Sequence, residues 1–285
     1  MGTSEFVLTA DLLNVARDVI IGETGIGVGA ALNVNALDVK RDLVVAGTSD
    51  LAVNTQTSAN VDGRAFVDTN STLKVAGDKF TVGSMLVNGK LVANVDEIIA
   101  DNGNIVIADN LYFYNAVDAD SGLLVDSNTL NSLTLKTTVQ DSVISVKDIE
   151  VVADKTLNLD SAGQILIGGG VYNQGDVVLS ANGMIDVANQ IINMGAVSIS
   201  GGTVVFGGIG NSADKDFVVV ANGDVDKNEL FIRSDNKTGV AQIVEEIIEN
   251  VKQNGDKALY EYADALADGS YSQGAMKLLF DDTVN

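Results

Sequence analysis

Four amino-acid types are missing from this chain of 285 residues: cysteine, histidine, tryptophan and proline. Without cysteine there can be no disulfide, no thiolate nucleophile and no zinc–thiolate site. Without histidine the usual general base, the serine–histidine–aspartate triad and the histidine metal ligands are excluded. The sequence therefore predicts a protein that is not an enzyme and has no transition metal or organic cofactor.

Basic residues are also few. The chain has 17 lysines and arginines against 39 aspartates and glutamates, a formal net charge of −22. Nucleic acids and anionic lipids bind proteins through lysine and arginine, so the charge counts against both as partners. No stretch resembles a transmembrane helix of ~20 apolar residues or a signal peptide. Residues 1–6 are typical of a cloning remnant, which is consistent with removal of a natural targeting signal.

Apolar residues make up 46% of the chain, enough for a hydrophobic core. They recur as apolar-x-apolar triplets at short intervals, for example at Leu37–Val39, Leu43–Val45 and Leu51–Val53. This alternation predicts short β-strands. The triplets follow one another at shorter intervals than the ~8–12 residues that separate the turns of a sandwich or barrel. Three such strands with their corners occupy ~20 residues, which suits one coil of a solenoid.

Asn-Gly pairs supply candidate corners between the strands, at Asn88-Gly89, Asn102-Gly103, Asn182-Gly183 and Asn222-Gly223. The same pairs are the strongest hairpin signal, so they do not choose between a solenoid and a meander. The repeat has no strict nonapeptide or hexapeptide period, which excludes a calcium-binding repeat roll and counts against a regular left-handed hexapeptide helix. The strand spacing favours an all-β fold, an irregular right-handed parallel β-helix over residues 7–237.

The pattern changes near Thr238. Apolar residues at helical spacing follow, from Val240 to Val251, with glutamates on the opposite side. Breaks at Asn254-Gly255 and at Asp268–Ser270 divide the stretch into short segments. We therefore expect residues 238–285 to form a short C-terminal α-helical segment, a cap or tail beside the last coil.

The glycine-rich run at 201–208, together with the many Asn-Gly and Asp-Gly corners, resembles the passenger domains of bacterial autotransporters. The helical stretch at 240–280 is similar to the segment that precedes the membrane barrel in that family. Haemagglutinin-like exoproteins of two-partner secretion are similar as well. The resemblance implies a secreted, cell-surface β-helix, here a passenger fragment whose signal peptide and outer-membrane anchor lie elsewhere.

Two sets of residues are candidate binding sites. Asp224, Asp226, Asn228 and Asp235 partly match the oxygen-ligand spacing of a calcium loop, although a solvated acidic corner explains them too. Tyr112 and Tyr114 share one face of a strand, with Phe113 on the other. If Phe113 points inward, the tyrosines form an exposed contact patch; the alternative is local packing against a loop or the next coil.

Acidic pairs such as Asp148/Glu150 could serve a glycosidase, but such pairs are too abundant here to indicate one. The sequence predicts a non-catalytic bacterial surface adhesin or self-association module. Its partners would be a surface protein or glycan of a host cell or bacterium, or a second copy of itself. The alternatives are a carbohydrate-active β-helix enzyme and a structural polymer or phage fibre component.

Overall fold

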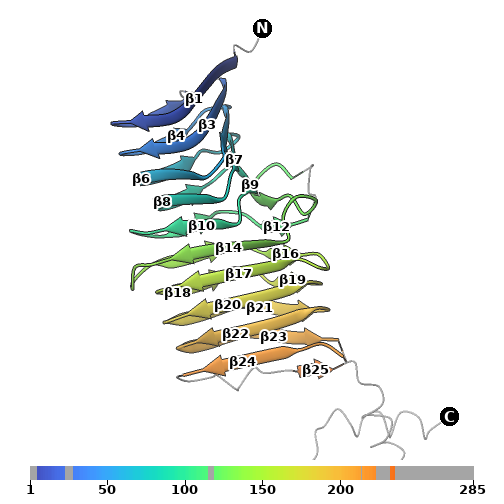
Figure 1. Ribbon diagram of the computed structural model, residues 1–285. Helices are drawn as coiled ribbons and strands as arrows, with labels where there is room; N and C mark the ends of the chain where they lie inside the picture. The colour runs from blue at the N-terminus through green and yellow to red at the C-terminus, as the bar shows by residue number, and fades with distance from the viewer. Residues whose placement is uncertain (1–4, 23–27, 115–118, 213, 223–231, 235–285) are drawn as a thin grey trace, which may run out of the picture. The chain divides into compact units, whose positions relative to one another are not determined.

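A computed structural model describes residues 5–22, 28–114, 119–212, 214–222 and 232–234. They form an all-β parallel solenoid of about 10 turns (Figure 1), which confirms the predicted solenoid. The chain divides into two compact units, Met1–Ser234 and Asp235–Asn285. The helices expected over 238–285 lie outside the described residues. No helix long and apolar enough to cross a membrane is found in the described part of the chain.

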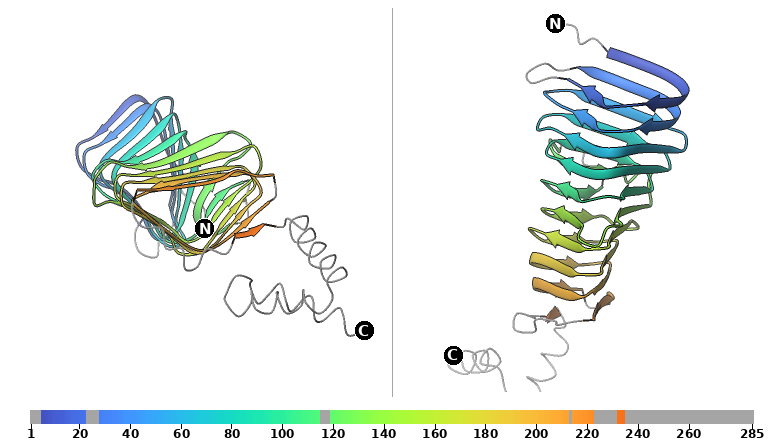
Figure 2. Two further views of the ribbon diagram at one scale, coloured as in Figure 1. Left: turned by 90° about the horizontal axis from the view of Figure 1, so that it is seen from below. Right: turned by 90° about the vertical axis from the view of Figure 1, so that its left-hand side faces the viewer.

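Strands of successive coils pair in parallel, with an offset close to the expected coil length. Leu157 pairs with Val177, 20 residues later. Between most neighbouring coils the offset ranges from 18 residues, between Phe80 and Ile98, to 24 between Phe6 and Ala30, and it reaches 39 between Ile105 and Ile144. Figure 2 shows the coils end-on and from the side. Because the coil length varies, no strict period is visible in the sequence.

The strands stack into three faces that enclose the core, called the first, second and third face in the order in which the chain passes through them. The first face contains β5 (Asp50–Thr55), β7 (Thr72–Ala76), β9 (Lys90–Asn94), β12 (Leu111–Phe113), β13 (Gly122–Val125), β16 (Ile149–Val151), β19 (Val171–Asn173) and β25 (Ile232–Ser234). The second contains β10 (Glu97–Ala100), β14 (Ser132–Thr137), β17 (Thr156–Ser161), β20 (Asp176–Ala181), β22 (Ala196–Gly201) and β24 (Phe217–Ala221). The third contains β2 (Val19–Ile21), β4 (Leu43–Val45), β11 (Ile105–Ile107), β15 (Val143–Val146) and β18 (Gln164–Ile167).

The longer strands pair on two faces each. The first and second faces share β1 (Glu5–Val15) and β3 (Gly29–Val39). The second and third share β6 (Ser58–Val67) and β8 (Lys79–Val87), whose mutual register shifts between Val61 and Arg64. The third and first share β21 (Met184–Asn193) and β23 (Thr203–Asn211), whose register shifts between Val187 and Gln190.

The core consists mainly of aliphatic side chains stacked coil upon coil, with Phe80 and Phe113 buried among them. In β14 and β17, buried and half-buried residues alternate, as the triplets predicted. On the first face, Leu51, Leu73 and Leu91 pair in succession and are almost completely buried. Burial of each such side chain stabilises the fold by about 1.5–3 kcal/mol. The Asn-Gly pairs at 88–89, 102–103 and 182–183 lie at corners between strands that pair in parallel with neighbouring coils, so they are not hairpin turns.

A buried asparagine ladder replaces one aliphatic stack in the lower coils. Asn173, Asn193 and Asn211 occupy the same register position. The Asn173 amide nitrogen donates to Asn193 Oδ1 at 2.8 Å, and that of Asn193 donates to Asn211 Oδ1 at 2.7 Å. The amide nitrogens of Asn173 and Asn193 also donate to the carbonyls of Gly175 (2.9 Å) and Gly195 (3.2 Å). The ladder therefore ties β19 and β21 to the corners that follow them.

The ladder ends at Asn173, whose Oδ1 is buried and has no hydrogen-bond partner among the described residues. Val151 occupies the matching position one coil above. We expect Val151→Asn to cost roughly half as much stability as Val177→Asn, because a new amide could donate to Asn173 Oδ1. Val177 stacks between Leu157 and Val197, and an asparagine there should cost about 3 kcal/mol. Urea unfolding of both variants tests this; equal losses would contradict it.

One strand of the first face is out of chain order. The chain leaves the sheet after β12 and returns with β13, which pairs with β9 on one side and with β12 on the other. On the other two faces, β10 pairs directly with β14 and β11 with β15. The first face is therefore one strand taller at this level, by about 4.8 Å.

Two features hold β13 in place: a glycine at its start and a set of hydrogen bonds made by Asp109. Gly122 has a φ of 97°, and a Cβ there would lie 2.3 Å from the carbonyl oxygen of Asn110, so only glycine fits this close approach. The two ends of the excursion are joined by Asp109, whose carboxylate accepts a hydrogen bond from Ser121. Asp109 also accepts from the backbone N–H of Asn110 at 3.0 Å and lies 3.4 Å from Lys147 Nζ.

These contacts give Asp109 a testable pH dependence. The Ser121 hydroxyl, then the Asn110 N–H and Lys147, lower the pKa of Asp109 below its ordinary 3.8. Its contribution to stability is therefore complete above the unfolded pKa and is lost as the pH falls through the folded pKa. We expect Asp109→Asn to lower the melting temperature at pH 7, and its difference from wild type to shrink as the pH falls below 3.8. Asp141→Asn, at an exposed corner, is the control; a gap that stays constant with pH would contradict the prediction.

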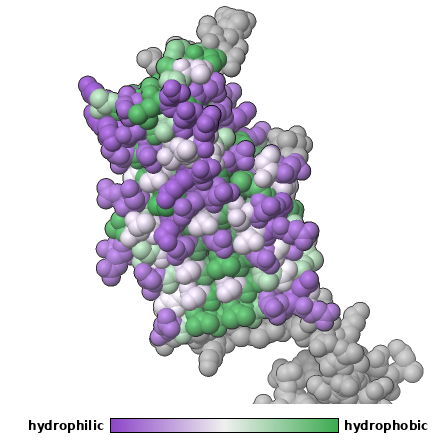
Figure 3. Space-filling view, viewed as in Figure 1, coloured by the Kyte–Doolittle hydropathy of each residue, from purple (hydrophilic) through white to green (hydrophobic). Residues whose placement is uncertain are grey.

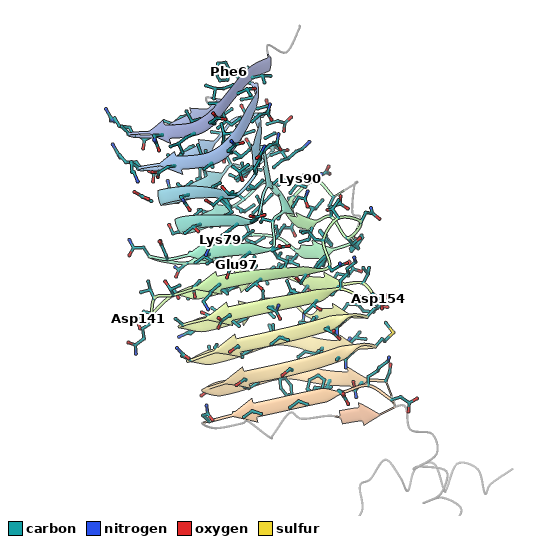
Figure 4. The ribbon with its side chains drawn as sticks, in the orientation of Figure 1. Phe6, Lys79, Lys90, Glu97, Asp141 and Asp154 are labelled. Atoms are coloured by element: carbon teal, nitrogen blue, oxygen red, sulfur yellow. The ribbon has the colours of Figure 1, made fainter. Side chains whose placement is uncertain are left out.

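The outer surface carries rows of polar side chains in register. Lys79 lies one coil above Glu97, with Nζ 3.4 Å from the carboxylate (Figure 4), and Lys136 contacts Asp160 at 2.7 Å. In Figure 3 the second face is toward the viewer, and hydrophobic residues gather over its lowest strands. They include Val218 and Val220, each about half exposed.

Candidate binding groove on the first face

A shallow groove of about 280 Å³ runs down the first face across four coils. Its centre is a row of outward-facing residues in register: Tyr112 pairs with Glu150, Glu150 with Tyr172, and Tyr172 with Ile192. A second row lies beside it and is formed by Asn110, Asp148, Gly170 and Gln190. The groove therefore combines aromatic, amide and carboxylate groups contributed by strands far apart in the sequence.

The predicted tyrosine pair forms the upper end of this region. Phe113 is completely buried and points inward, which is the condition for the tyrosines to face outward. Tyr112 and Tyr114 are half-buried and pack edge to face, with ring centroids 5.4 Å apart and an interplanar angle of 78°. The Tyr112 hydroxyl lies 2.8 Å from the Asn110 amide. Of the pair, only Tyr112 lines the groove, and an interaction role for both stays a prediction.

The second row is held rigidly by internal hydrogen bonds. Asp148 Oδ1 accepts from the backbone N–H of Gly170 at 2.7 Å. The Asn110 amide is oriented so that its oxygen accepts a hydrogen bond from the Tyr112 hydroxyl. In this orientation its nitrogen donates to Asp148 Oδ2 at 3.2 Å and to Asp109 Oδ1 at 3.3 Å. Both carboxylate oxygens of Asp148 are thus engaged by the protein itself. This residue is a wall of the groove, and the Asp148/Glu150 pair is unlike two free carboxylates facing a substrate.

Glu150 and Tyr172 form the middle of the groove. Partial burial raises the pKa of Tyr114, and the nearby Glu150 carboxylate raises it further. The Tyr172 side chain is 36% exposed and its hydroxyl accepts from Gln174 at 3.2 Å. The neighbouring side chains therefore position both groups while leaving part of Tyr172 open to a ligand.

The charge of the groove is negative. Asp148 and Glu150 line it, and none of its lining residues, all in the described part of the chain, is a lysine or arginine. Together with the net charge of −22, this disfavours anionic ligands.

The weak calcium candidate at Asp224, Asp226, Asn228 and Asp235 lies outside the described residues. Lower on the solenoid, a hollow of about 340 Å³ is lined by several aspartates, Asp154 and Asp176 among them, with Lys215. Nowhere in the described ranges do three or more acidic side chains come together in a way that could hold a metal ion.

No protein-family model matches this chain, and no match was found among curated proteins or solved structures. The fold and the groove are therefore the basis for a proposed function.

Sequence reasoning missed Glu150 and Tyr172 as partners of Tyr112. Tyr112 and Glu150 are 38 residues apart, because the excursion with β13 lengthens that coil, so a ~20-residue period does not align them. One local signal was present: the unbroken run Leu123-Leu124-Val125 lacks alternation and all three side chains are buried, as they are in Ile98-Ile99-Ala100 of β10.

Proposed function

We propose that this chain is the right-handed β-helix of a bacterial cell-surface adhesin or self-association module, exported and displayed outside the cell, without catalytic activity. The observation that supports it is the outer surface, where successive coils place polar side chains in register. Asn54 donates to Asn33 at 2.8 Å, Asn35 to Asp11 at 3.2 Å, and Lys136 to Asp160 at 2.7 Å. Such a surface suits many weak contacts along a face, where avidity matters more than one deep pocket.

The net charge makes self-association dependent on salt. Two copies carrying −22 each repel as they approach, and salt screens that repulsion over about 8 Å at physiological ionic strength. Contact must then come from neutral polar groups and from apolar side chains such as Val218 and Val220. Association should therefore strengthen with added salt, the opposite of the behaviour of a nucleic-acid binder.

We expect cells that display the whole chain to aggregate or to bind host cells, and aggregation to increase over a salt series. The double variant Val218→Ser/Val220→Ser should aggregate less if the lower second face is a contact. Ile20→Ser, at another exposed apolar position, is its matched control. Displayed cells that neither aggregate nor adhere at any salt concentration would show a passive stalk, and aggregates that dissolve in salt would contradict the charge argument.

A further inference from the structure

We propose that the groove of the first face binds a neutral, β-linked glycan chain that lies along the direction in which the coils stack. This rests on the proposed function as a surface-binding module and names a ligand for one of its faces. The row Tyr112–Glu150–Tyr172–Ile192 contacts the sugars, and the row Asn110–Asp148–Gly170–Gln190 forms the wall beside them.

The spacing of the two tyrosines carries the proposal. They belong to strands separated by one intervening strand, β16. Neighbouring strands lie about 4.8 Å apart, so the tyrosine backbones are about 10 Å apart along the stack. In an extended β-linked glycan every second sugar has the same orientation, and the disaccharide repeat is close to this separation. Tyr112 and Tyr172 can therefore contact equivalent apolar faces of two alternate sugars.

Polar groups are placed between and beside the aromatic contacts. Glu150 lies at the level of the intervening sugar, where its carboxylate can accept hydrogen bonds from hydroxyl groups. Asn189 and Gln190 are exposed at the lower end and can both donate and accept. Asp148 accepts from the Asn110 amide and from the backbone N–H of Gly170, which holds the wall in one geometry before a ligand arrives.

Charge selects among polymers of similar length. A polyuronate or sulfated glycan would be repelled by Asp148, Glu150 and the net charge. A cationic peptide would be attracted by the same charges, but its affinity would fall with salt. A neutral glycan has no such dependence, and its repeat fits the two-strand spacing of the tyrosines.

The test is calorimetric titration of the purified full chain with β-1,4-linked gluco-oligosaccharides of two to six sugars. We expect affinity to rise from the disaccharide to the tetrasaccharide, then to level off, because the groove spans three strand spacings, about 14 Å. Affinity should not change over a salt series. An α-1,4-linked hexasaccharide and a polygalacturonate should bind at least tenfold more weakly.

Tyr172→Ala should weaken binding of the tetrasaccharide roughly tenfold and Glu150→Gln by a smaller factor. Phe66→Ala is the matched control, since it removes a half-buried aromatic ring from the third face. Melting temperatures of the variants verify that each remains folded. No binding of β-linked oligosaccharides at millimolar concentration, unchanged affinity in Tyr172→Ala, or salt-weakened binding of a lysine-rich peptide in their place would overturn the proposal.

The cell-display assay separates this inference from the function on which it rests. Aggregation or adhesion of displayed cells by a chain that binds no β-linked oligosaccharide in the titration would refute the glycan groove and leave the adhesin intact. Glycan binding in solution by a chain that causes no adhesion when displayed would refute the adhesin and support the groove.

Discussion

Gly195→Ala is expected to destabilise the lower coils by about 3 kcal/mol or more. A Cβ on Gly195 would lie 1.8 Å from the carbonyl oxygen of Gly175 and 2.7 Å from the carbonyl carbon of Gln174. Both are backbone atoms of the coil above, so no side-chain rotation relieves the overlap. The coils would have to separate at this corner, where the Ala196 N–H donates to the Gly175 carbonyl at 2.8 Å, and strain of this kind exceeds ordinary overpacking.

Gly210→Ala is the matched control for this prediction. A Cβ on Gly210 would meet no atom within 4 Å, and Gly210 lies in a regular strand, so alanine should be neutral or slightly stabilising. Urea unfolding followed by circular dichroism compares the two variants with wild type. A Gly195→Ala protein within ~0.5 kcal/mol of wild type would show that the coils are not in contact at this corner.

Asn193→Ala is expected to cost about 3 kcal/mol, because it removes the central member of the asparagine ladder. Asn193 is completely buried. Its Oδ1 accepts from Asn173 at 2.8 Å and from the Gly195 N–H at 3.1 Å, and its amide donates to Asn211 Oδ1 at 2.7 Å. Alanine would leave a cavity and unpaired buried groups, each of which costs about 1–3 kcal/mol.

The effect should also be local, since each coil contacts only its neighbours. Hydrogen exchange should accelerate in the strands β19, β21 and β23 and remain slow in β5 and β7. Asn182→Ala, at an exposed corner, should change stability by no more than ~0.5 kcal/mol. Uniform loss of protection along the solenoid would contradict nearest-neighbour behaviour, and a loss no larger than that of Asn182→Ala would contradict a structural role of the ladder.

The ladder itself could have been inferred from the sequence. Asn173-Gln174-Gly175 and Asn193-Met194-Gly195 repeat the same Asn-x-Gly pattern 20 residues apart, the expected coil length. The pattern has a physical basis, because each asparagine bonds the carbonyl of the glycine two positions later and each glycine permits close approach of the preceding coil. The Asn-Gly pairs are the more conspicuous signal, but they are ambiguous because they occur both in hairpin turns and at solenoid corners.

Local chemistry along the chain was sufficient to predict short strands, a coil of ~20 residues and a hydrophobic core, because alternation and turn preference act over a few residues. The position of β13 and the alignment of Tyr112, Glu150 and Tyr172 depend on registers between residues 12 to 38 apart. Those registers follow from the length of every intervening corner and excursion and from the packing of buried side chains between coils. They are therefore properties of the assembled solenoid, and the groove exists only through them.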